Sequence, residues 1–403
     1  MMKKQYRLMI LALTLLSLWG CSDDDSPRVE LFDVNVVALY PEDFSSDQAE
    51  GVTLKLVNNA TGDQQEKISG ADGRATFAGL VPGTYQLTAS RFLNAQEAST
   101  LTGSSSEINL NYLDNNLLLS AATGQDALSI RLSGSISGSL VIRQVYYSGS
   151  KTPENTNYFF DQFVEIYNNS SESIALDGLM ISNVEGPSGQ INPNTQPSPF
   201  AKDQEHVYIS TAWRIPGTGS DHMLAPFTSV VIAQQGINHR SEEANPNSPV
   251  NLSNADFELF VTGSQRDIDA PNVPNMEMIY HPFNATYSLV TVFGPGTIIW
   301  RTDDFAALER APIPDTSPTF PQVVKVPVAN VIDAVEALRS ATDGAFKRVP
   351  AQLDAGFTFV SNTYTGESIV RKSTTVDGNI VMKDTNNSSE DFEIKSTPAP
   401  KSF

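Results

Sequence analysis

The chain has 403 residues, and its 26 Lys and Arg are outnumbered by 46 Asp and Glu, which gives a formal net charge of −20 at pH 7. This charge argues against binding to nucleic acid or directly to anionic lipid headgroups. The chain has one cysteine, so no disulfide can form within it, and its length allows two or three domains.

The first twenty residues have the pattern of an export signal. Three basic residues precede an almost wholly apolar stretch from Leu8 to Trp19. A membrane-spanning helix needs about 20 apolar residues, so this stretch is too short and is typical of a cleaved signal. It ends in a sequence, Gly20-Cys21, that resembles a lipobox. We therefore expect residues 1–20 to be a signal peptide and Cys21 to be lipidated.

An acidic run follows Cys21. Asp23, Asp24 and Asp25 resemble the surface-export signal of lipoproteins from Bacteroidota, and an acidic segment over 21–28 also suits a flexible tether. The sequence therefore predicts an outer-membrane protein that is held by its lipid and faces the cell exterior. Because Cys21 is the only cysteine, lipidation would leave no thiol for catalysis or metal binding.

The region 29–135 has the pattern of a β-sandwich. Val52, Leu54 and Leu56 alternate with Thr53, Lys55 and Val57, as in a strand with one buried face. A tight turn is predicted at Asp72-Gly73. The segments Asp72–Phe77 (D-G-x-a-x-F) and Gly79–Leu87 (G-L-x-P-G-x-Y-x-L) resemble the carboxypeptidase-regulatory-like, or prealbumin-like, module. That resemblance implies a stalk or spacer without catalytic groups.

A second β region extends over 139–396, ahead of a short tail at 397–403. The segment Phe163–Asn168 (F-V-E-I-Y-N), with the residues 174–179 that follow it, resembles the signature of lamin-tail domains. The resemblance implies an immunoglobulin-like sandwich that is closed by strands near the C-terminus. The whole chain is therefore predicted to be all-β, with two tandem sandwiches.

The stretch at about 184–330 exceeds a plain lamin-tail domain, so we expect it to elaborate the second sandwich. Clusters of Pro, Asn, Ser and Gly predict long loops at 184–205, 236–254 and 262–277. After this stretch, apolar residues fall on one face of a helix that Asn330 could cap, with Asp333 in its first turn. These residues are Val331, Ile332, Val335 and Leu338. We therefore expect one helix there, and a shorter turn from Phe305 to Glu309.

The sequence contains no standard catalytic or cofactor motif: H-E-x-x-H, G-x-S-x-G, Walker and dinucleotide patterns are all missing. The four histidines, His206, His222, His239 and His281, are not spaced as metal ligands, so no metal or cofactor is predicted. The acidic segment 384–391 has oxygen ligands that calcium prefers, but a turn built by side chain–backbone hydrogen bonds is favoured. A hydrolase is disfavoured, although two carboxylates alone could make a glycosidase.

The loop from Ala212 to His222 combines an aromatic residue, an arginine and a Gly-rich turn. Trp213, Arg214 and His222 are candidate binding residues, because Trp and Arg are enriched at binding hot spots. The alternative interpretation is structural: Trp213 fills the edge of the sandwich while Pro and Gly turn the chain. Trp300-Arg301 allows the same two interpretations.

Taken together, these features resemble an uncharacterised lipoprotein family of Bacteroidota, domain of unknown function 4876, whose members are often encoded beside TonB-dependent receptors. The resemblance implies a non-enzymatic surface lipoprotein that presents a ligand to an uptake system or braces its receptor. An iron compound is the cargo suggested by analogy alone. The alternative is an adhesin or structural surface protein that binds glycans or proteins of a host or matrix through exposed aromatic side chains.

Overall fold

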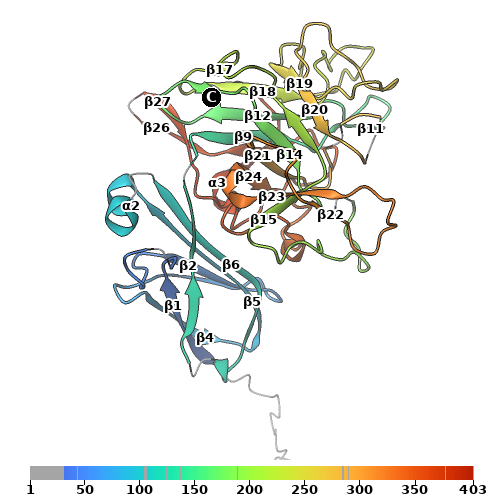
Figure 1. The fold of residues 1–403 in the computed structure, drawn as a ribbon. Coiled ribbons are helices and arrows are strands. Elements are labelled where there is room, and N and C mark those ends of the chain that lie inside the picture. Colours follow the sequence, from blue (N-terminus) through green and yellow to red (C-terminus); the bar gives the residue numbers. More distant parts are fainter. Residues whose placement is uncertain are drawn as a thin grey trace, which may run out of the picture.

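The computed structural model describes residues 31–402 except 43, 104–106, 124–125, 137, 188, 284–285, 289 and 377. Nearly all regular structure in these residues is strand (Figure 1), with two short α-helices. The all-β class predicted from the sequence is confirmed. The predicted signal peptide, Cys21 and the acidic run Asp23–Asp25 lie outside the described residues.

The N-terminal domain is a sandwich of two sheets. One sheet has the strand order β4-β1-β7, and the other has the order β3-β2-β5-β6-β8. The strands are β1 (Phe32–Leu39), β2 (Thr53–Asn58), β3 (Gln64–Ile68), β4 (Arg74–Leu80), β5 (Gly83–Leu93), β6 (Ile108–Leu119), β7 (Leu128–Arg131) and β8 (Ser133–Ile136). In β1, Val34, Val36 and Ala38 are buried while the residues between them are half-buried. Such alternation places one face of each sheet in a common apolar core.

Two local features connect these strands. The predicted tight turn is present: Gly73 has a φ of 72°, and a Cβ there would lie 2.5 Å from the carbonyl oxygen of Ala38. Helix α2 (Ala95–Thr102), which the sequence analysis did not predict, follows β5. It begins with a capping box, in which the Asn94 side chain accepts from backbone N–H groups of the first turn and Glu97 accepts from the N–H of Asn94.

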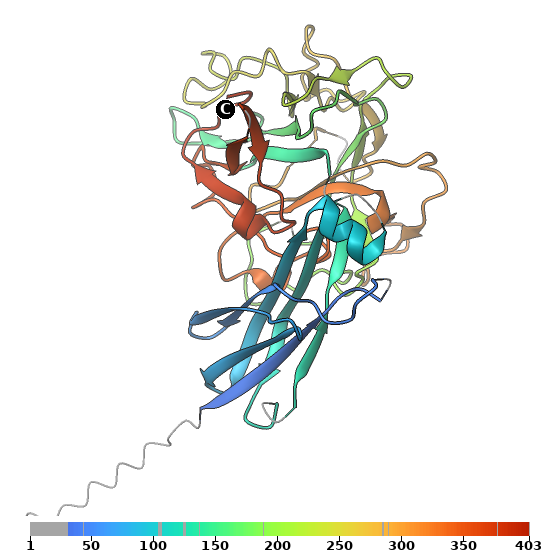
Figure 2. The ribbon, with the colours of Figure 1, turned by 90° about the vertical axis from the view of Figure 1, so that its left-hand side faces the viewer.

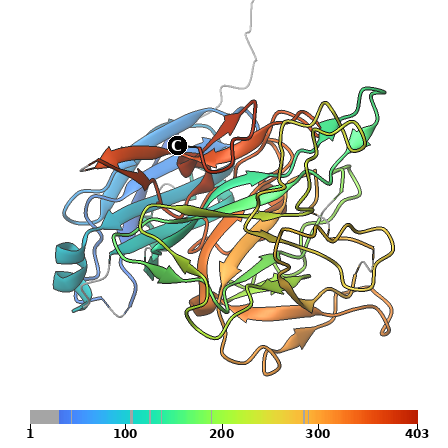
Figure 3. The same cartoon turned by 90° about the horizontal axis from the view of Figure 1, so that it is seen from above.

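The C-terminal domain stacks three sheets. The first has the order β19-β18-β12-β9-β25-β28, the second β20-β16-β14-β21-β24, and the third β15-β23-β22. Viewed from above (Figure 3), the red C-terminal strands and the orange segment of β22 and β23 lie on opposite sides of the domain.

The strands of the six-stranded sheet are β9 (Leu140–Tyr146), β12 (Phe163–Asn168), β18 (Ser229–Ala233), β19 (Phe257–Glu258), β25 (Ser368–Arg371) and β28 (Phe392–Lys395). Those of the five-stranded sheet are β14 (Met180–Asn183), β16 (Ala212–Arg214), β20 (Glu277–Tyr280), β21 (Gly296–Trp300) and β24 (Val331–Glu336). The third sheet consists of β15 (His206–Ile209), β22 (Arg310–Ala311) and β23 (Val323–Pro327). Shorter pairs are β10 (Ser150–Lys151) with β11 (Asn157–Tyr158), β13 (Ile174–Ala175) with β17 (Met223–Leu224), and β26 (Ser373–Val376) with β27 (Asn379–Met382). Short helical segments are η2 (Val328–Asn330), η3 (Gly344–Phe346) and α3 (Ser388–Asp391).

The five-stranded sheet is buried on both faces. Ile181 and Ile299 belong to the core shared with the six-stranded sheet. Met180, Ile298 and Trp300 belong to a second core, shared with the three-stranded sheet. Because successive side chains of a strand point to opposite faces, one apolar strand can supply two cores. The third sheet, whose strands all lie within the stretch 184–330, is therefore an additional layer on the sandwich.

The outer face of the six-stranded sheet is covered by loops. Tyr146 and Phe163 of this sheet pack with Val250, Leu252 and Val273 from the loops predicted at 236–254 and 262–277. The described residues of these two loops and of the loop predicted at 184–205 contain no helix or strand before β20 begins at Glu277. Their only β pairing is two isolated bridges, at Val184 and Asn275. The segment 305–309 contains a turn, as expected.

The helix expected after Asn330 is wrong, because the structure has strand β24 there. Val331, Ile332 and Val335 are β-branched and fit a pleated strand at least as well as one face of a helix. Pairing with β21 decides between the two: Thr297 lies opposite Val335 and Ile299 opposite Asp333. Asn330 ends the short η2 segment instead of capping a helix.

The two domains contact each other through β6. Asn111 Nδ2 donates to the carbonyl oxygen of Thr385 (3.3 Å), and Asn115 Nδ2 donates to that of Gly344 (3.4 Å). Strand β1 begins at the end of the N-terminal sandwich that lies away from the C-terminal domain (Figure 2). Among the described residues, no helix is both long enough and apolar enough to span a membrane.

Candidate functional site

The C-terminal domain holds a half-open cavity of about 400 Å³ where β14 ends and β21 begins. Its walls come from the residues after β14, the β15–β16 turn, the β20–β21 loop, the β22–β23 loop and Arg348. Most of them lie in the expected elaboration. Ligand sites commonly have volumes of about 300–1,000 Å³, so a small molecule fits this one. The lining residues on which the argument depends are Glu185, Thr211, His281, Phe283, Phe320 and Arg348.

Arg348 lines the cavity, but its guanidinium group is already paired. Nε and Nη2 donate to Glu336 at 2.9 and 2.6 Å, and Nη2 also donates to the carbonyl oxygens of Gly294 and Ala337. Both charged side chains are almost fully buried. A Cβ at Gly186 would lie 2.6 Å from Arg348 Cδ, so glycine at this position leaves room for the arginine side chain to pack against the backbone. The pair therefore ties the wall of the cavity to β24.

Glu185 is the acidic group of the cavity. Its backbone N–H donates to the carbonyl oxygen of Tyr208 (2.7 Å), which fixes the chain after β14. Burial raises the pKa of the Glu185 carboxyl, although the charge of Arg348 and the N–H of Gly186 favour its ionised form. Among the described residues, this carboxylate forms no salt bridge with Lys, Arg or His, and Arg348 is the nearby cation that acts on it.

Aromatic rings form the apolar walls. The rings of Phe283 and Phe320 lie 5.7 Å apart, and the Phe320 side chain is 45% exposed. His281 lies in the same loop as Phe283, and burial lowers its pKa, so the ring is neutral near pH 7. The Thr211 hydroxyl accepts the backbone N–H of Asn183 (3.0 Å). The cavity thus combines apolar faces with a few polar groups.

The sequence-predicted residue Trp213 lies behind this cavity. It is 1% exposed in the core between the two large sheets, and its ring meets the His281 ring edge-on at 5.5 Å. Arg214, next in β16, forms an ion pair with Glu277 of β20 at 2.5 Å on the surface. Trp213 therefore supports a lining residue from behind, and Arg214 links two neighbouring strands.

His222 and Trp213 are not brought together into one site. The loop that precedes His222 wraps around Asp177, which accepts backbone N–H groups of Gly219, Asp221 and His222 at 2.7–2.8 Å. Burial alone would raise the pKa of Asp177, but these donors hold it well below its usual value. The His222 ring also contacts this carboxylate, with Nδ1 3.1 Å from Oδ1. The Gly-rich turn is thus organised around a buried carboxylate.

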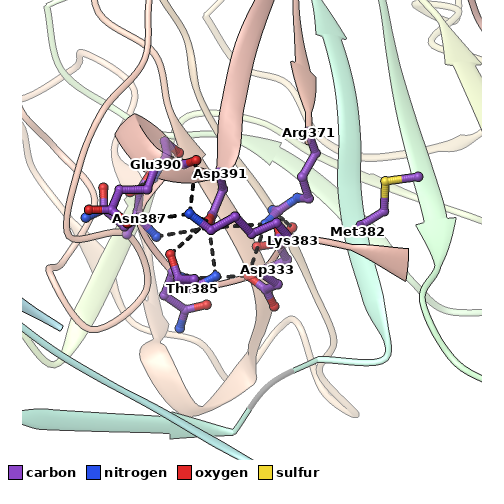
Figure 4. Close-up of polar contacts among 12 residues, drawn as sticks. Asp333, Arg371, Met382, Lys383, Thr385, Asn387, Glu390 and Asp391 are labelled. Carbon is purple, nitrogen blue, oxygen red and sulfur yellow. Dashed lines mark hydrogen bonds and ion pairs between the residues drawn. The ribbon is translucent and has the colours of Figure 1, made fainter. Parts of the chain in front are cut away.

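The acidic segment 384–391 forms a turn and helix α3 beside a buried arginine (Figure 4). Arg371 donates to Asp333 (2.6 Å) and Asp384 (3.0 Å), and Asp391 lies 3.6 Å away. Asp391 accepts the N–H and the hydroxyl of Thr385. These carboxylates therefore pair with Arg371 and accept hydrogen bonds from the backbone. In the part of the chain that the structure describes, no group of three or more His, Cys, Asp or Glu could hold a metal ion.

The remaining histidines have separate partners. His206 Nδ1 lies 3.1 Å from Asp203 Oδ2, and His239 Nδ1 lies 2.7 Å from the hydroxyl of Tyr158. His239 Nε2 donates to the carbonyl oxygen of Gln235 (3.0 Å), and burial lowers the pKa of this histidine to about 4. His239 is therefore neutral near pH 7 and lies within the core.

The fold and the cavity define an all-β protein of two sandwich domains, with a ligand-sized cavity in the enlarged second domain. The sequence model of a family described as "Protein of unknown function (DUF4876)" matches residues 225–399. A crystal structure of a DUF4876 family protein from Bacteroides thetaiotaomicron is 30% identical, with a TM-score of 0.55, and the likeness covers 90% of this chain and 94% of that one. No curated protein matches. The chain belongs to the DUF4876 family, which confirms the resemblance read from the sequence.

Sequence reasoning placed an elaboration at about 184–330 but did not predict a cavity in it or the residues that line one. Glu185, Phe283 and Phe320 lie in loops without a recognisable motif, and Arg348 lies beyond the expected elaboration. One signal was available in the sequence. Bulky aromatic residues in polar, Pro-rich loops are not part of a strand with a buried face, so they indicate candidate lining residues. Their convergence depends on three separate loops meeting at one sheet edge, which no local pattern reports.

Proposed function

We propose that this protein is a lipid-anchored protein of the outer-membrane surface, and that it binds a small molecule in the C-terminal cavity beside a TonB-dependent receptor. The observation that carries the proposal is the 400 Å³ cavity with aromatic walls and an ionisable group. The lipobox-like sequence at Cys21 and the acidic run after it support the location. The N-terminal sandwich then acts as a stalk that holds the cavity away from the lipid.

The proposed role is binding and not catalysis. The cavity lining has a serine, two threonines and a histidine. The Ser210 hydroxyl donates to the carbonyl oxygen of Asn183 (3.4 Å), and the hydroxyls of Thr211 and Thr291 accept from backbone N–H groups. No hydrogen bond among the described residues joins any of these hydroxyls to His281. Activation of a hydroxyl nucleophile requires such a link to a base.

The location is tested by fractionating cells that express two variants. Cys21→Ser is expected to move the protein into the soluble fraction, because the lipid is the proposed anchor. Replacement of Asp23, Asp24 and Asp25 by Ala is expected to leave it in the membrane but protect it from protease added to intact cells. Membrane retention of Cys21→Ser, or unchanged protease sensitivity of the triple variant, contradicts the corresponding part of the proposal.

The partnership is tested by pull-down from detergent-solubilised outer membrane. The tagged protein is expected to recover a TonB-dependent receptor, and recovery of the bait alone contradicts this role.

Phe320→Ala removes one wall of the cavity, and Phe92→Ala is the matched control, because Phe92 is 46% exposed on the N-terminal domain. Protein from native membranes should release a small molecule on denaturation, and Phe320→Ala but not Phe92→Ala should lose it. Binding to a glycan array without any receptor would favour the adhesin alternative.

A further inference from the structure

The charge that the cavity offers to a ligand is negative. Arg348 is the cationic residue in its lining, and its donors are taken by Glu336 and by backbone carbonyl oxygens. The carboxylate of Glu185 feels the charge of Arg348 but forms no salt bridge with a described residue, because the donors of Arg348 are directed to Glu336 and to carbonyl oxygens. A half-buried carboxylate without a direct ion pair costs free energy, so a ligand cation that pairs with it restores favourable electrostatics. The net charge of −20 favours the approach of a cation as well.

The apolar walls also favour a cation. The faces of aromatic rings carry partial negative charge and attract ammonium groups within about 6 Å. Phe283 and Phe320 present two rings 5.7 Å apart at an interplanar angle of 54°, and the side chain of Ile313 lies in the same wall. The same rings pack well against an aromatic or aliphatic body. His281 is neutral near pH 7, so it does not repel a cation there.

We propose that the cavity binds small molecules that combine one ammonium group with an aromatic or aliphatic body. Glu185 pairs with the ammonium group, Phe283 and Phe320 pack on the body, and the Thr211 hydroxyl supplies a further hydrogen bond. This inference rests on the proposed function, since it names the ligand class of the same cavity. It commits to a free small molecule and not to the amino group of a partner protein.

The test compares three probes with one body and different head groups: 2-phenylethylamine, 2-phenylethanol and 3-phenylpropionate. Titration calorimetry on the soluble chain that begins at Ser22 measures each dissociation constant. We expect the amine to bind at least about tenfold more tightly than the alcohol, a difference that corresponds to about 1.4 kcal/mol. The carboxylate probe should bind most weakly, because Glu185 repels it.

Two variants and one control assign the effect to residues. Glu185→Gln is expected to weaken binding of the amine about tenfold and to leave the alcohol unchanged. Phe320→Ala is expected to weaken all probes that bind. Glu243→Gln, an exposed carboxylate outside the cavity lining, should change nothing and controls for the net charge of the chain.

The outcomes separate this inference from the proposed function. Equal binding of amine and alcohol, or an amine affinity that Glu185→Gln leaves unchanged, overturns the ligand class while the cavity remains a binding site. If no probe binds, both the ligand class and the cavity's role in the proposed function are contradicted. If Phe320→Ala and Phe92→Ala have the same effect on amine binding, the ligand lies elsewhere, and the proposal for this cavity fails.

Discussion

The two domains differ in how they treat charge in their interiors. In the N-terminal sandwich, the buried polar residues within the described part are Asn58, Ser69, Asn109 and Asn111, and none is charged. The C-terminal domain buries ion pairs such as Glu165 with Arg143, and Glu336 with Arg348. A plain sandwich can form from alternating side chains alone, whereas the larger domain joins distant segments through specific pairs.

These pairs connect loops to sheets. Arg348 joins the segment after η3 to β24, and Arg371 of β25 joins β24 to the segment before α3. A buried pair is weak evidence for added stability, because its desolvation cost can match its attraction. Removal of one partner is nevertheless costly, since the other charge stays buried alone. The comparison thus predicts that loss of a single buried charge destabilises the C-terminal domain, whereas the N-terminal domain is destabilised by loss of a single buried apolar side chain.

The largest expected effect is that of Arg371→Met. Three carboxylates, Asp333, Asp384 and Asp391, would remain buried without their guanidinium, and we expect a loss of about 3–5 kcal/mol in the free energy of unfolding. Trp213 and Trp300 both lie in the C-terminal core, so the intrinsic fluorescence of the chain from Ser22 reports on this domain during urea denaturation.

The matched control is Arg74→Met in the N-terminal domain. Arg74 is exposed and its pairing with Asp72 spans 3.6 Å, so a change within about 0.5 kcal/mol is expected. Equal losses for the two variants would show that burial does not decide the importance of a charge in this chain.

The next effect is that of Leu87→Ala in the N-terminal core. Leu87 is fully buried, and a cavity in its place is expected to cost about 2–5 kcal/mol. Circular dichroism should show an earlier transition while the fluorescence transition of the C-terminal tryptophans stays in place. If both signals shift together, the contacts of Asn111 and Asn115 couple the domains into one cooperative unit.

The sequence was sufficient where structure is local. The alternation around Leu54 and the turn at Gly73 are properties of a few consecutive residues, and both were predicted. Helix α2 could have been predicted from Asn94 and Glu97, whose spacing is that of a capping box. The same local reasoning favoured a helix at Val331, where the spacing of apolar residues fits the period of a helix as well as that of a strand.

The sequence was insufficient where structure depends on pairing at long range. Strand β24 exists because β21, more than thirty residues earlier, lies beside it. The cavity has the same origin, since Glu185, Phe283 and Phe320 meet only when the third sheet packs on the second. Buried charge also misleads, because an arginine such as Arg348 reads as a surface residue until its partner Glu336 is known.

A smaller effect is expected from pH, and again only in the C-terminal domain. Burial raises the pKa of Glu258 to about 7, although its oxygens accept the N–H groups of Gly236 and Ala270 at 2.7 Å. Burial also raises the pKa values of Asp333 to about 7 and Asp391 to about 6. These three carboxyls bind protons in the folded state that they lack in the unfolded state between about pH 4 and 7, so they lower stability as pH rises. His239 and His281, whose pKa values burial lowers, act in the opposite direction, and we expect the three carboxyls to decide the sign.

The measurement is the urea midpoint by tryptophan fluorescence at pH 5.5 and pH 8, and we expect a decrease on the order of 1 kcal/mol at the higher pH. The midpoint of the N-terminal transition by circular dichroism is the internal reference, because that core holds no charged side chain among the described residues. A fluorescence midpoint that rises with pH would contradict the raised pKa values of these carboxyls.

The smallest effect is expected from Lys383→Met, a change that removes a positive charge from the same acidic cluster as Arg371→Met. Lys383 Nζ lies 3.5 Å from Glu390 and 3.8 Å from Asp391, but its side chain is 37% exposed. Figure 4 shows these three residues side by side. Water can therefore solvate the neighbouring carboxylates when the Lys383 charge is removed, and the expected cost is about 0–1 kcal/mol. Fluorescence-detected denaturation measures both variants under the same conditions. A loss equal to that of Arg371→Met would mean that the number of charges around Asp391, and not their burial, stabilises this domain.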